Sequence, residues 1–215
     1  MGGGDMKKFL FNDNFLLTKA VLDGRKTQTR RIITCPKTFH GKDVFGFYVY
    51  MRKTDGVITE VCMYDEDVSP IDEGQILPKY KVGEVVAVAQ SYNTLFEEQY
   101  DDTLEMLDLC KSAGWSNKMF VRAELMPHQI RIIDVRVERL QDISDECCLK
   151  EGIIKKWHAP ACKNYYYVPG VEVKGVKDVH DTPQEAFAHL INKVSGKNVW
   201  GQNPYVFVYD FELVK

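Results

Sequence analysis

The β-prone segments of this chain are short, and helices do not alternate with them one for one. Strand-like composition predicts strands near residues 45–51, 57–64, 82–90, 119–123, 129–140 and 205–214, and helical patterns occur near residues 14–23, 94–113, 144–152 and 182–196. A doubly wound parallel sheet requires crossover helices between neighbouring strands. The order of segments therefore favours an α+β fold, with a mainly antiparallel sheet or β-barrel and helices packed at its ends.

Local capping and turn signals define several of these boundaries. Gly24 is placed to end the first helix, and Ser144 is placed to cap a short one. The run Thr182-Pro-Gln-Glu185 is a capping box with proline at the first helical position. Asp55-Gly56 between two β-rich runs is typical of a hairpin. We expect irregular structure in the two remaining stretches, residues 65–76 and 154–181.

Composition excludes several classes of protein. The 215 residues are 45% apolar and 27% charged, which is ordinary for a globular chain. No run approaches the roughly 18 apolar residues of a membrane span, so we expect no membrane partner and a cytoplasmic protein. Residues 1–6 are expected to be a disordered leader or tag remnant, with Met6 as a possible native start. Without a secretion signal, the six cysteines should be reduced thiols.

The net charge of −3 conceals an uneven distribution along the chain. Residues 1–53 carry 11 Lys/Arg and 4 Asp/Glu, whereas residues 54–120 carry 4 Lys/Arg and 14 Asp/Glu. An anionic ligand would be attracted to the first segment, and free nucleic acid would be repelled by the second. The alternative is that the charges average out on folding and carry no functional meaning.

The most informative run is Gly24-Arg-Lys-Thr-Gln-Thr-Arg-Arg31. Cations after a helix C-terminus are favourable for electrostatic reasons alone, so one interpretation is an exposed edge strand with helix-capping cations. In the other interpretation, the chain is still turning at Lys26, and Lys26 and Thr29 face one point. A lysine made neutral by desolvation could then take the proton of the Thr29 hydroxyl. Arg31 would share the Thr29 face of an extended segment and is a candidate contact for an oxyanion or a phosphate.

Common cofactor and metal motifs are missing from the sequence. It contains no GxGxxG, GxxxxGK[ST], GxSxG or HExxH pattern. His158-x3-Cys162 and Cys35-x4-His40 each offer two soft ligands, whereas a zinc site needs four. We therefore expect neither a metal nor a cofactor.

In combination with several later segments, the basic run resembles the signature of the ASCH domain family, which belongs with the PUA-like β-barrels. The resembling segments are residues 82–90, 135–144, 151–153 and 200–211. The resemblance implies a single ASCH/PUA-like domain over residues 7–215, similar to the larger ASCH proteins of phages and prophages. Relative to the minimal domain it would carry insertions near residues 39–76, 94–118 and 154–181.

The resemblance also implies a ligand class and a site. PUA-like barrels commonly bind RNA or modified nucleobases in a barrel cleft, and one branch of ASCH proteins consists of bacterial amidohydrolases that deacetylate acetylcytidine. Lys26, Thr29 and Glu151 match the base, the nucleophile and the proton carrier of that branch. The resemblance carries over only those three residues. From the basic run itself we expect substrate or nucleic-acid contacts at Arg25, Arg30 and Arg31. Gln90 is a further candidate, at a position where phage-type relatives carry an acid.

Three functions remain open from the sequence. The first is an ASCH-type domain that binds RNA or a modified nucleobase, and the second is an amidohydrolase that deacylates an acylated cytidine or similar nucleoside. The third is a non-enzymatic, phage-related interaction module. A monomer is favoured. Convergence of Lys26, Thr29 and Glu151 at a concave pocket would favour the second function over the third.

Overall fold

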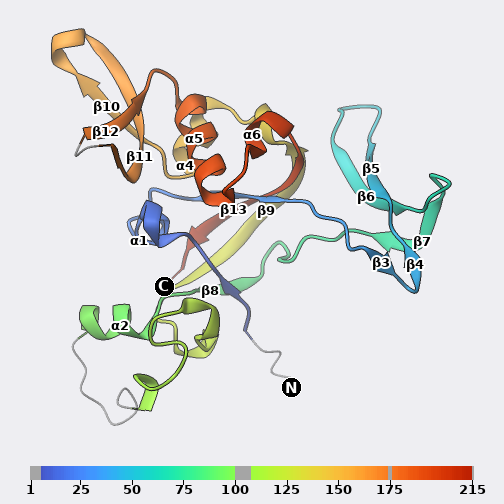
Figure 1. The fold of residues 1–215 in the computed structure, drawn as a ribbon, viewed down its shortest axis with the longest axis horizontal. Coiled ribbons are helices and arrows are strands. Elements are labelled where there is room, and N and C mark those ends of the chain that lie inside the picture. The colour runs from blue at the N-terminus through green and yellow to red at the C-terminus, as the bar shows by residue number, and fades with distance from the viewer. Residues whose placement is uncertain (1–5, 100–107, 174–175, 215) are drawn as a thin grey trace.

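The computed structural model describes residues 6–99, 108–173 and 176–214 (Figure 1). Its centre is a five-stranded sheet in the order β1–β8–β9–β13–β2. The strands are β1 (Lys8–Phe9), β2 (Gln28–Ile32), β8 (Val85–Val88), β9 (Gln129–Arg139) and β13 (Tyr205–Leu213). β1 runs parallel to β8, and the other neighbouring pairs are antiparallel. The fold is therefore α+β with mainly antiparallel pairing, as the order of segments predicts.

A bulge interrupts the long ladder between β9 and β13. From Asp210 to Phe211 of β13, the partner residue shifts from Asp134 to Ile132, which leaves Ile133 as an extra residue. The apolar residues of β9 predict this change of register, because their alternation changes phase in the middle of the strand. The bulge lets apolar side chains on both halves of β9 face the core.

The sheet does not close into a barrel within the described ranges, which differs from the closed or nearly closed barrel expected from the sequence. β1 and β2 are its two edges, and β1 contains only two residues with which β2 could form a ladder. The Arg31 side chain of β2 instead spans the gap. Its Nη2 donates to the Leu10 carbonyl oxygen at 2.6 Å, and its guanidinium lies 4.9 Å from the centre of the Phe9 ring.

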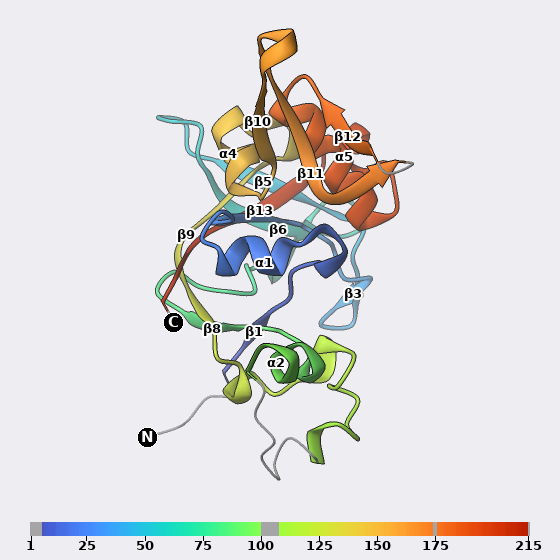
Figure 2. The same cartoon turned by 90° about the vertical axis from the view of Figure 1, so that its left-hand side faces the viewer.

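Aromatic side chains fill the concave side of the sheet. Phe9 stacks on Phe11 and Tyr80, with ring centres 4.9 and 4.5 Å apart, and Tyr209 packs edge-on against Phe9 at 6.0 Å. All four rings are buried. Figure 2 shows α1 lying across the open side of the sheet, between β13 and β8. This part of the interior is therefore apolar, and polar groups of a ligand would have to bind at its rim.

The helices that follow Ser144 and Thr182 begin where the capping signals predict, whereas the helix expected over residues 14–23 is divided in two, because Leu16 adopts a φ of 51°. Asn12 accepts a hydrogen bond from the Asn14 amide at the first turn, and Ser144 accepts one from the Cys147 amide. The predicted capping box before the longest of these helices is present in full. The helices of this part are η1 (Asp13–Phe15), α1 (Leu17–Leu22), η4 (Leu140–Asp142), α4 (Asp145–Lys150), α5 (Pro183–Ser195) and α6 (Val199–Gln202). Figure 1 shows α4, α5 and α6 together on one side of the sheet.

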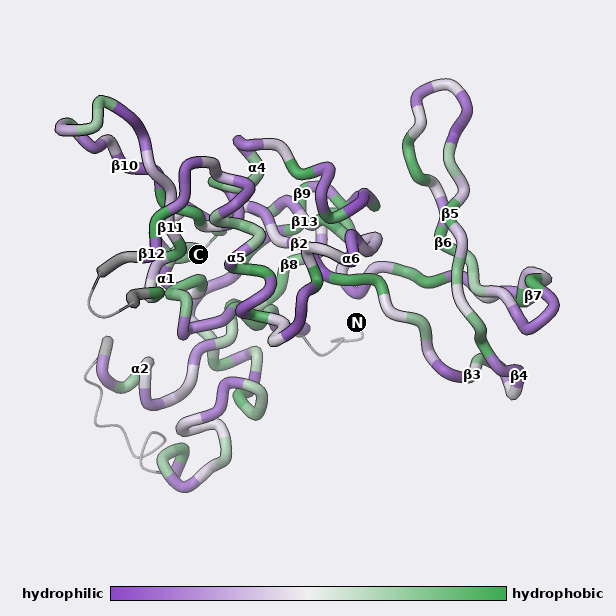
Figure 3. The backbone as a smooth tube through the Cα atoms, turned by 45° about the horizontal axis from the view of Figure 1, so that its top comes forward, coloured by the Kyte–Doolittle hydropathy of each residue, from purple (hydrophilic) through white to green (hydrophobic). Residues whose placement is uncertain are grey.

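Five short strands between β2 and β8 form an extension, which projects away from the rest of the chain (Figure 3). The strands are β3 (Thr38–Phe39), β4 (Lys42–Asp43), β5 (Gly46–Met51), β6 (Ile58–Tyr64) and β7 (Pro70–Gln75). β5 and β6 form the predicted hairpin, with Gly56 at a φ of 70°. β7 corrects the prediction of a loop over residues 65–76, because it forms an antiparallel ladder with β6.

A second apolar cluster lies next to β8, around α2 (Tyr92–Gln99). Met6 packs against this cluster, and residues 1–5 of the expected leader lie outside the described residues. The helix predicted over residues 94–113 is described up to Gln99, and residues 100–107 lie outside the described residues. The strand predicted at residues 119–123 is wrong. That segment contains η2 (Lys118–Phe120) and the start of η3 (Ala123–Leu125), because the Asn117 side chain accepts from the Met119 amide and initiates a tight turn.

Residues 154–173 and 176–180 form a three-stranded antiparallel sheet, which corrects the expectation of irregular structure. The strands are β10 (Ile154–His158), β11 (Lys163–Val173) and β12 (Val176–His180), and η5 (Ala159–Ala161) joins the first two. The pattern is hidden in the sequence because Pro169 and Gly170 lie inside β11, next to a shift in register. Like the extension and α2, this sheet lies outside the central five strands. None of the helices in the described ranges is long and apolar enough to cross a lipid bilayer.

Candidate functional site

Lys26 is the centre of the candidate site, and the end of α1 fixes its position. Gly24 adopts a φ of 71°, which ends the helix, and the Lys26 amide donates to the Ala20 carbonyl oxygen at 2.9 Å. The chain therefore turns back against α1 before β2 begins. The Lys26 side chain is only 1% exposed.

Glu151 reaches the same point from the end of α4. It is the C-terminal cap of α4, and Gly152 follows with a φ of 106°. A Cβ atom at Gly152 would lie 3.2 Å from Leu17 Cδ2 and 3.8 Å from Lys26 Cδ. The missing side chain therefore lets α4 end directly against α1, which brings the Glu151 carboxylate to the lysine.

Lys26 makes three hydrogen bonds, which is the full donor capacity of a protonated amine. Nζ donates to the Gln28 carbonyl oxygen at 2.8 Å, to the Glu151 carbonyl oxygen at 2.8 Å and to Glu151 Oε2 at 2.6 Å. Burial lowers the pKa of Lys26, and the Glu151 carboxylate opposes this shift. To act as a base, Lys26 would have to lose a proton and turn its lone pair toward Thr29.

Arg30 binds the other oxygen of Glu151. Its Nη1 donates to Glu151 Oε1 at 3.0 Å and to Gln28 Oε1 at 2.6 Å, and its Nη2 donates to Glu138 Oε1 at 2.6 Å. Burial alone would lower the pKa of Arg30, but the two carboxylates outweigh it, so the pKa is raised. We call this set of residues the buried network: Lys26, Gln28, Arg30, Glu138 and Glu151.

Thr29 lies on the opposite face of β2 from Arg30, because side chains alternate along a strand. It lines a cavity of about 60 Å³ together with Lys26, Arg31 and Glu151, and part of Arg30 reaches the same cavity. Within the described part of the chain, no group hydrogen-bonds to the Thr29 hydroxyl. The three residues implied as catalytic therefore meet at one cavity. That cavity has room for roughly two water molecules, at about 30 Å³ each, and is far smaller than the 300–1,000 Å³ or so of ligand pockets.

A larger cavity of about 490 Å³ adjoins the small one at the gap between β1 and β2, and Leu10 and Arg31 line both. Lys79, Tyr80 and Tyr209 also line the larger cavity, whose volume is in the range of ligand pockets. No carboxylate of the described residues lies within salt-bridge distance of Arg31. The charge of Arg31 is therefore available at the opening.

Two of the predicted binding residues lie elsewhere. Arg25 is exposed and pairs with Asp23 at 3.3 Å. Gln90 is buried and lines a separate cavity of about 270 Å³ between α1 and α2, together with Lys19 and Thr94. Neither Arg25 nor Gln90 lines the cavities at Thr29 and Arg31.

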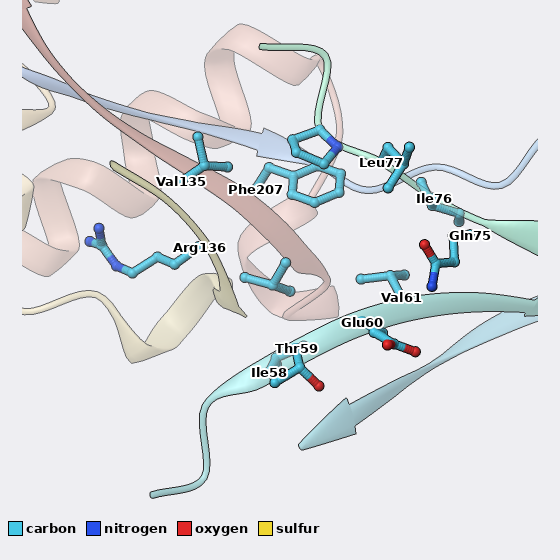
Figure 4. Close-up of a pocket in the computed structure, with 12 residues that line it drawn as sticks. Ile58, Thr59, Glu60, Val61, Gln75, Ile76, Leu77, Val135, Arg136 and Phe207 are labelled. Atoms are coloured by element: carbon cyan, nitrogen blue, oxygen red, sulfur yellow. The ribbon is translucent and has the colours of Figure 1, made fainter. Parts of the chain in front are cut away.

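A further cavity, of about 160 Å³, lies between the extension and the central sheet (Figure 4). Thr59 and Val61 of β6 line one side of it, and Phe207 of β13 lines the other. Leu77 and Phe207 also line the 490 Å³ cavity, so the two cavities are neighbours. Its small volume makes it the weaker candidate for a ligand.

Sequence reasoning missed Glu138, Lys79 and Tyr80. Glu138 lies 108 residues from Arg30 in the sequence. Val206 of β13 pairs with Glu138 of β9 on one side and with Ile32 of β2 on the other. Arg30 is two residues from Ile32 on the same face of β2, so its side chain can reach Glu138 across β13. That proximity depends on the register of three strands, which has no local signal in the sequence.

Comparison with known proteins adds no assignment, because the chain matches no family model, no curated protein and no solved structure. Function must therefore come from the chemistry of the site.

Proposed function

We propose that the chain is an ASCH-type, PUA-like protein that binds RNA or a modified nucleoside at the gap between β1 and β2. The observation that carries the proposal is the position of Arg31, which spans this gap without a carboxylate partner in the described ranges. In this proposal the curled central sheet is an open relative of the PUA-like barrel. The ligand occupies the opening that a fully closed barrel would lack.

The 490 Å³ cavity offers the chemistry that a nucleotide needs. Tyr80, Phe207 and Tyr209 provide aromatic surface against which a base can pack. Arg31 and Lys79 provide two cations for a phosphate, and the planar guanidinium can donate two parallel hydrogen bonds. A mostly apolar wall with a few convergent polar groups is typical of a small-molecule site.

The hairpin of β10 and β11 would offer a second, separate surface to an RNA strand (Figure 1). Trp157 is 60% exposed, and its neighbours Lys155 and Lys156 are also exposed. An exposed indole next to two lysines suits base stacking beside a phosphate backbone. Tyr167 on β11 is buried, so the tyrosine run serves the packing of the sheet at least in part.

A binding screen followed by one substitution tests the proposal. Cytidine, acetylated cytidine, cytidine monophosphate and a short single-stranded RNA are titrated into the full chain by calorimetry. Arg31→Ala should weaken a phosphate-bearing ligand at least about tenfold, because a hydrogen bond to a charged group contributes roughly 1.5–3 kcal/mol. Arg25→Ala removes the same charge outside the cavity and should change the affinity less than about twofold. Equal losses in both variants, or no binding in the whole panel, would overturn the proposal.

A second candidate function is deacylation of an acylated cytidine or similar nucleoside, favoured by the meeting of Lys26, Thr29 and Glu151 at one cavity. The Thr29 hydroxyl would attack the acyl carbon while neutral Lys26 takes its proton, and the amine would leave with a proton carried by Glu151. Water would then hydrolyse the acyl ester on Thr29. The small cavity would have to widen toward Arg31 to admit the acyl group.

Hydrolysis of acetylated cytidine by matched threonine variants tests this candidate. Thr29→Ala should abolish turnover, whereas Thr27→Ala, two residues away, should retain it. Glu151→Gln should lower the rate about 10²–10⁴-fold, as expected for loss of general acid–base catalysis. The effects of the two substitutions should not add, because the residues act as one unit. Full turnover by Thr29→Ala would exclude Thr29 as the nucleophile.

A further inference from the structure

Asp178, His180 and His189 form a cluster remote in sequence from the buried network. Asp178 and His180 lie two residues apart on β12, so their side chains share one face of the strand, and His189 lies on α5. One possible ligand atom from each residue lies within 4.8 Å of the others. The two imidazole rings are 5.3 Å apart, centre to centre.

The distances in the cluster match those between ligands of one metal ion. His189 Nδ1 lies 3.5 Å from Asp178 Oδ2, and His180 Nε2 lies 4.0 Å from Asp178 Oδ1. Ligands about 2.0–2.1 Å from a tetrahedral Zn²⁺ are separated by roughly 3.3 Å. Small rotations of the three side chains would therefore close the cluster around an ion.

The histidines also carry polar atoms that lack partners. The Nε2 atoms of His180 and His189 are buried, and neither has a hydrogen-bond partner in the described ranges. Buried polar atoms are rarely left without a partner. A metal ion would occupy the lone pair of His180, and either nitrogen of His189 can face it, because a half-turn of the ring exchanges the two edges.

We propose that Asp178, His180 and His189 bind a divalent transition-metal ion of the Zn²⁺ class, which ties β12 to α5. Neutral imidazoles and a carboxylate are preferred ligands of Zn²⁺, and three protein ligands leave one position for water or an added ligand. The negative charge of Asp178 partly neutralises the ion. The positive charge of Lys193, one turn along α5 from His189, repels the ion, so we expect an intermediate affinity.

This cluster has no local motif in the sequence, unlike the pairs His158-x3-Cys162 and Cys35-x4-His40. Asp178 and His180 are separated by one residue, which puts ligands together only if the segment is a strand. Because the sequence predicts irregular structure over residues 154–181, the spacing of Asp178 and His180 does not predict that their side chains share a face. The partner His189 depends on how α5 packs against β12.

Titration of the full chain with Co²⁺ tests the proposal, with the thiols kept reduced by a phosphine. One equivalent of Co²⁺ should produce a visible d–d absorption band that one equivalent of Zn²⁺ removes. Zn²⁺ should also raise the thermal unfolding midpoint, because an ion that binds only the folded state stabilises it. His189→Ala and Asp178→Asn should each lower the affinity at least about tenfold, the lower end of what even outer-shell changes cost.

A matched control excludes one of the two other ligand pairs in the sequence, His158 and Cys162. The double variant His158→Ala, Cys162→Ser removes a histidine and a thiol outside the cluster and should keep the affinity and the absorption band. Asp178→Asn keeps the shape of the side chain, so it reports on binding even if His189→Ala does not fold. Loss of the band in the control, or full affinity in Asp178→Asn, would overturn the proposal.

Discussion

Arg30 and Arg31 are adjacent in the sequence but lie in opposite environments. The Arg30 side chain is 1% exposed and is held by Glu138 and Glu151. Arg31 is exposed, with its guanidinium between the Leu10 carbonyl oxygen and the Phe9 ring. Because side chains alternate along β2, neighbouring arginines point to opposite faces of the sheet.

The contrast between Arg30 and Arg31 separates cations that are paired with carboxylates from a cation that can bind a ligand. Lys26 and Arg30 are neutralised inside the buried network, and Arg25 pairs with Asp23 at the surface. Most of the charge in the basic run therefore does not face a ligand. The charge counted along the sequence overstates the attraction for an anionic ligand, because it includes cations that are already paired with carboxylates in the folded chain.

The largest effect is expected from breaking the buried network at Glu151. Glu151→Ala leaves Lys26 and Arg30 buried with a missing carboxylate, and the free energy of unfolding should fall by about 3–5 kcal/mol. Urea unfolding at neutral pH measures the loss.

Glu138→Ala is the matched control for this prediction. The Glu138 side chain is 20% exposed, and Arg30 keeps its contact with Glu151, so the loss should be smaller. A larger loss for Glu138→Ala than for Glu151→Ala would mean that Glu151 is not the centre of the network.

The free energy of unfolding should fall at alkaline pH because of Tyr80, which lies in the apolar interior next to Arg31. Burial raises the pKa of Tyr80 from 10.0 to about 12, and its hydroxyl donates to the Lys8 carbonyl oxygen at 2.7 Å. The unfolded chain would lose this proton first, so the contribution is complete below pH 10 and is lost as the pH rises toward 12. The expected loss is at most about 3 kcal/mol.

Unfolding free energies between about pH 8 and pH 11 check this prediction. Tyr80→Phe should flatten the decline without abolishing it, because burial raises the pKa of Tyr209 in the same direction. Identical slopes for the wild type and Tyr80→Phe would show that Tyr80 does not titrate differently in the two states.

The salt dependence of RNA affinity should distinguish Arg31 from Arg25. If Arg31 contacts a phosphate of bound RNA, Arg31→Ala should lower the slope of log K against log [salt] by about 1. Arg25→Ala should leave the slope unchanged. An unaltered slope in Arg31→Ala would place the phosphate contact elsewhere.

The smallest effect is expected at Arg25. Its pair with Asp23 is exposed, so Arg25→Ala should change the free energy of unfolding by less than about 0.5 kcal/mol. Chemical denaturation checks this, and a loss above 1 kcal/mol or so would assign Arg25 a structural role that its contacts do not explain.

The elements with local signals could be predicted from the sequence. The capping box at Thr182 and Glu185 defines the start of α5, and Asp55-Gly56 defines the turn between β5 and β6. Both depend on residues within a few positions of each other. β7 and β11 were missed because proline and glycine inside them resemble loop composition.

The partners of the site residues could not be predicted from local patterns. Lys26 and Glu151 are 125 residues apart, and only the family resemblance places them together. The contact between Arg30 and Glu138 follows from the register of β2, β13 and β9, which the sequence does not encode locally.

The free energies of unfolding of Arg30→Ala and Arg31→Ala, measured side by side, test the central claim most directly. Both variants lose the same side chain at adjacent positions of β2. Arg30→Ala should cost about 3 kcal/mol or more, because it removes a buried cation that binds both Glu138 and Glu151 and leaves only Lys26 to neutralise Glu151. Arg31→Ala should cost less than about 1 kcal/mol, because its place at the gap is partly exposed. Equal costs, or a larger cost for Arg31→Ala, would contradict the assignment of Arg30 to structure and Arg31 to binding.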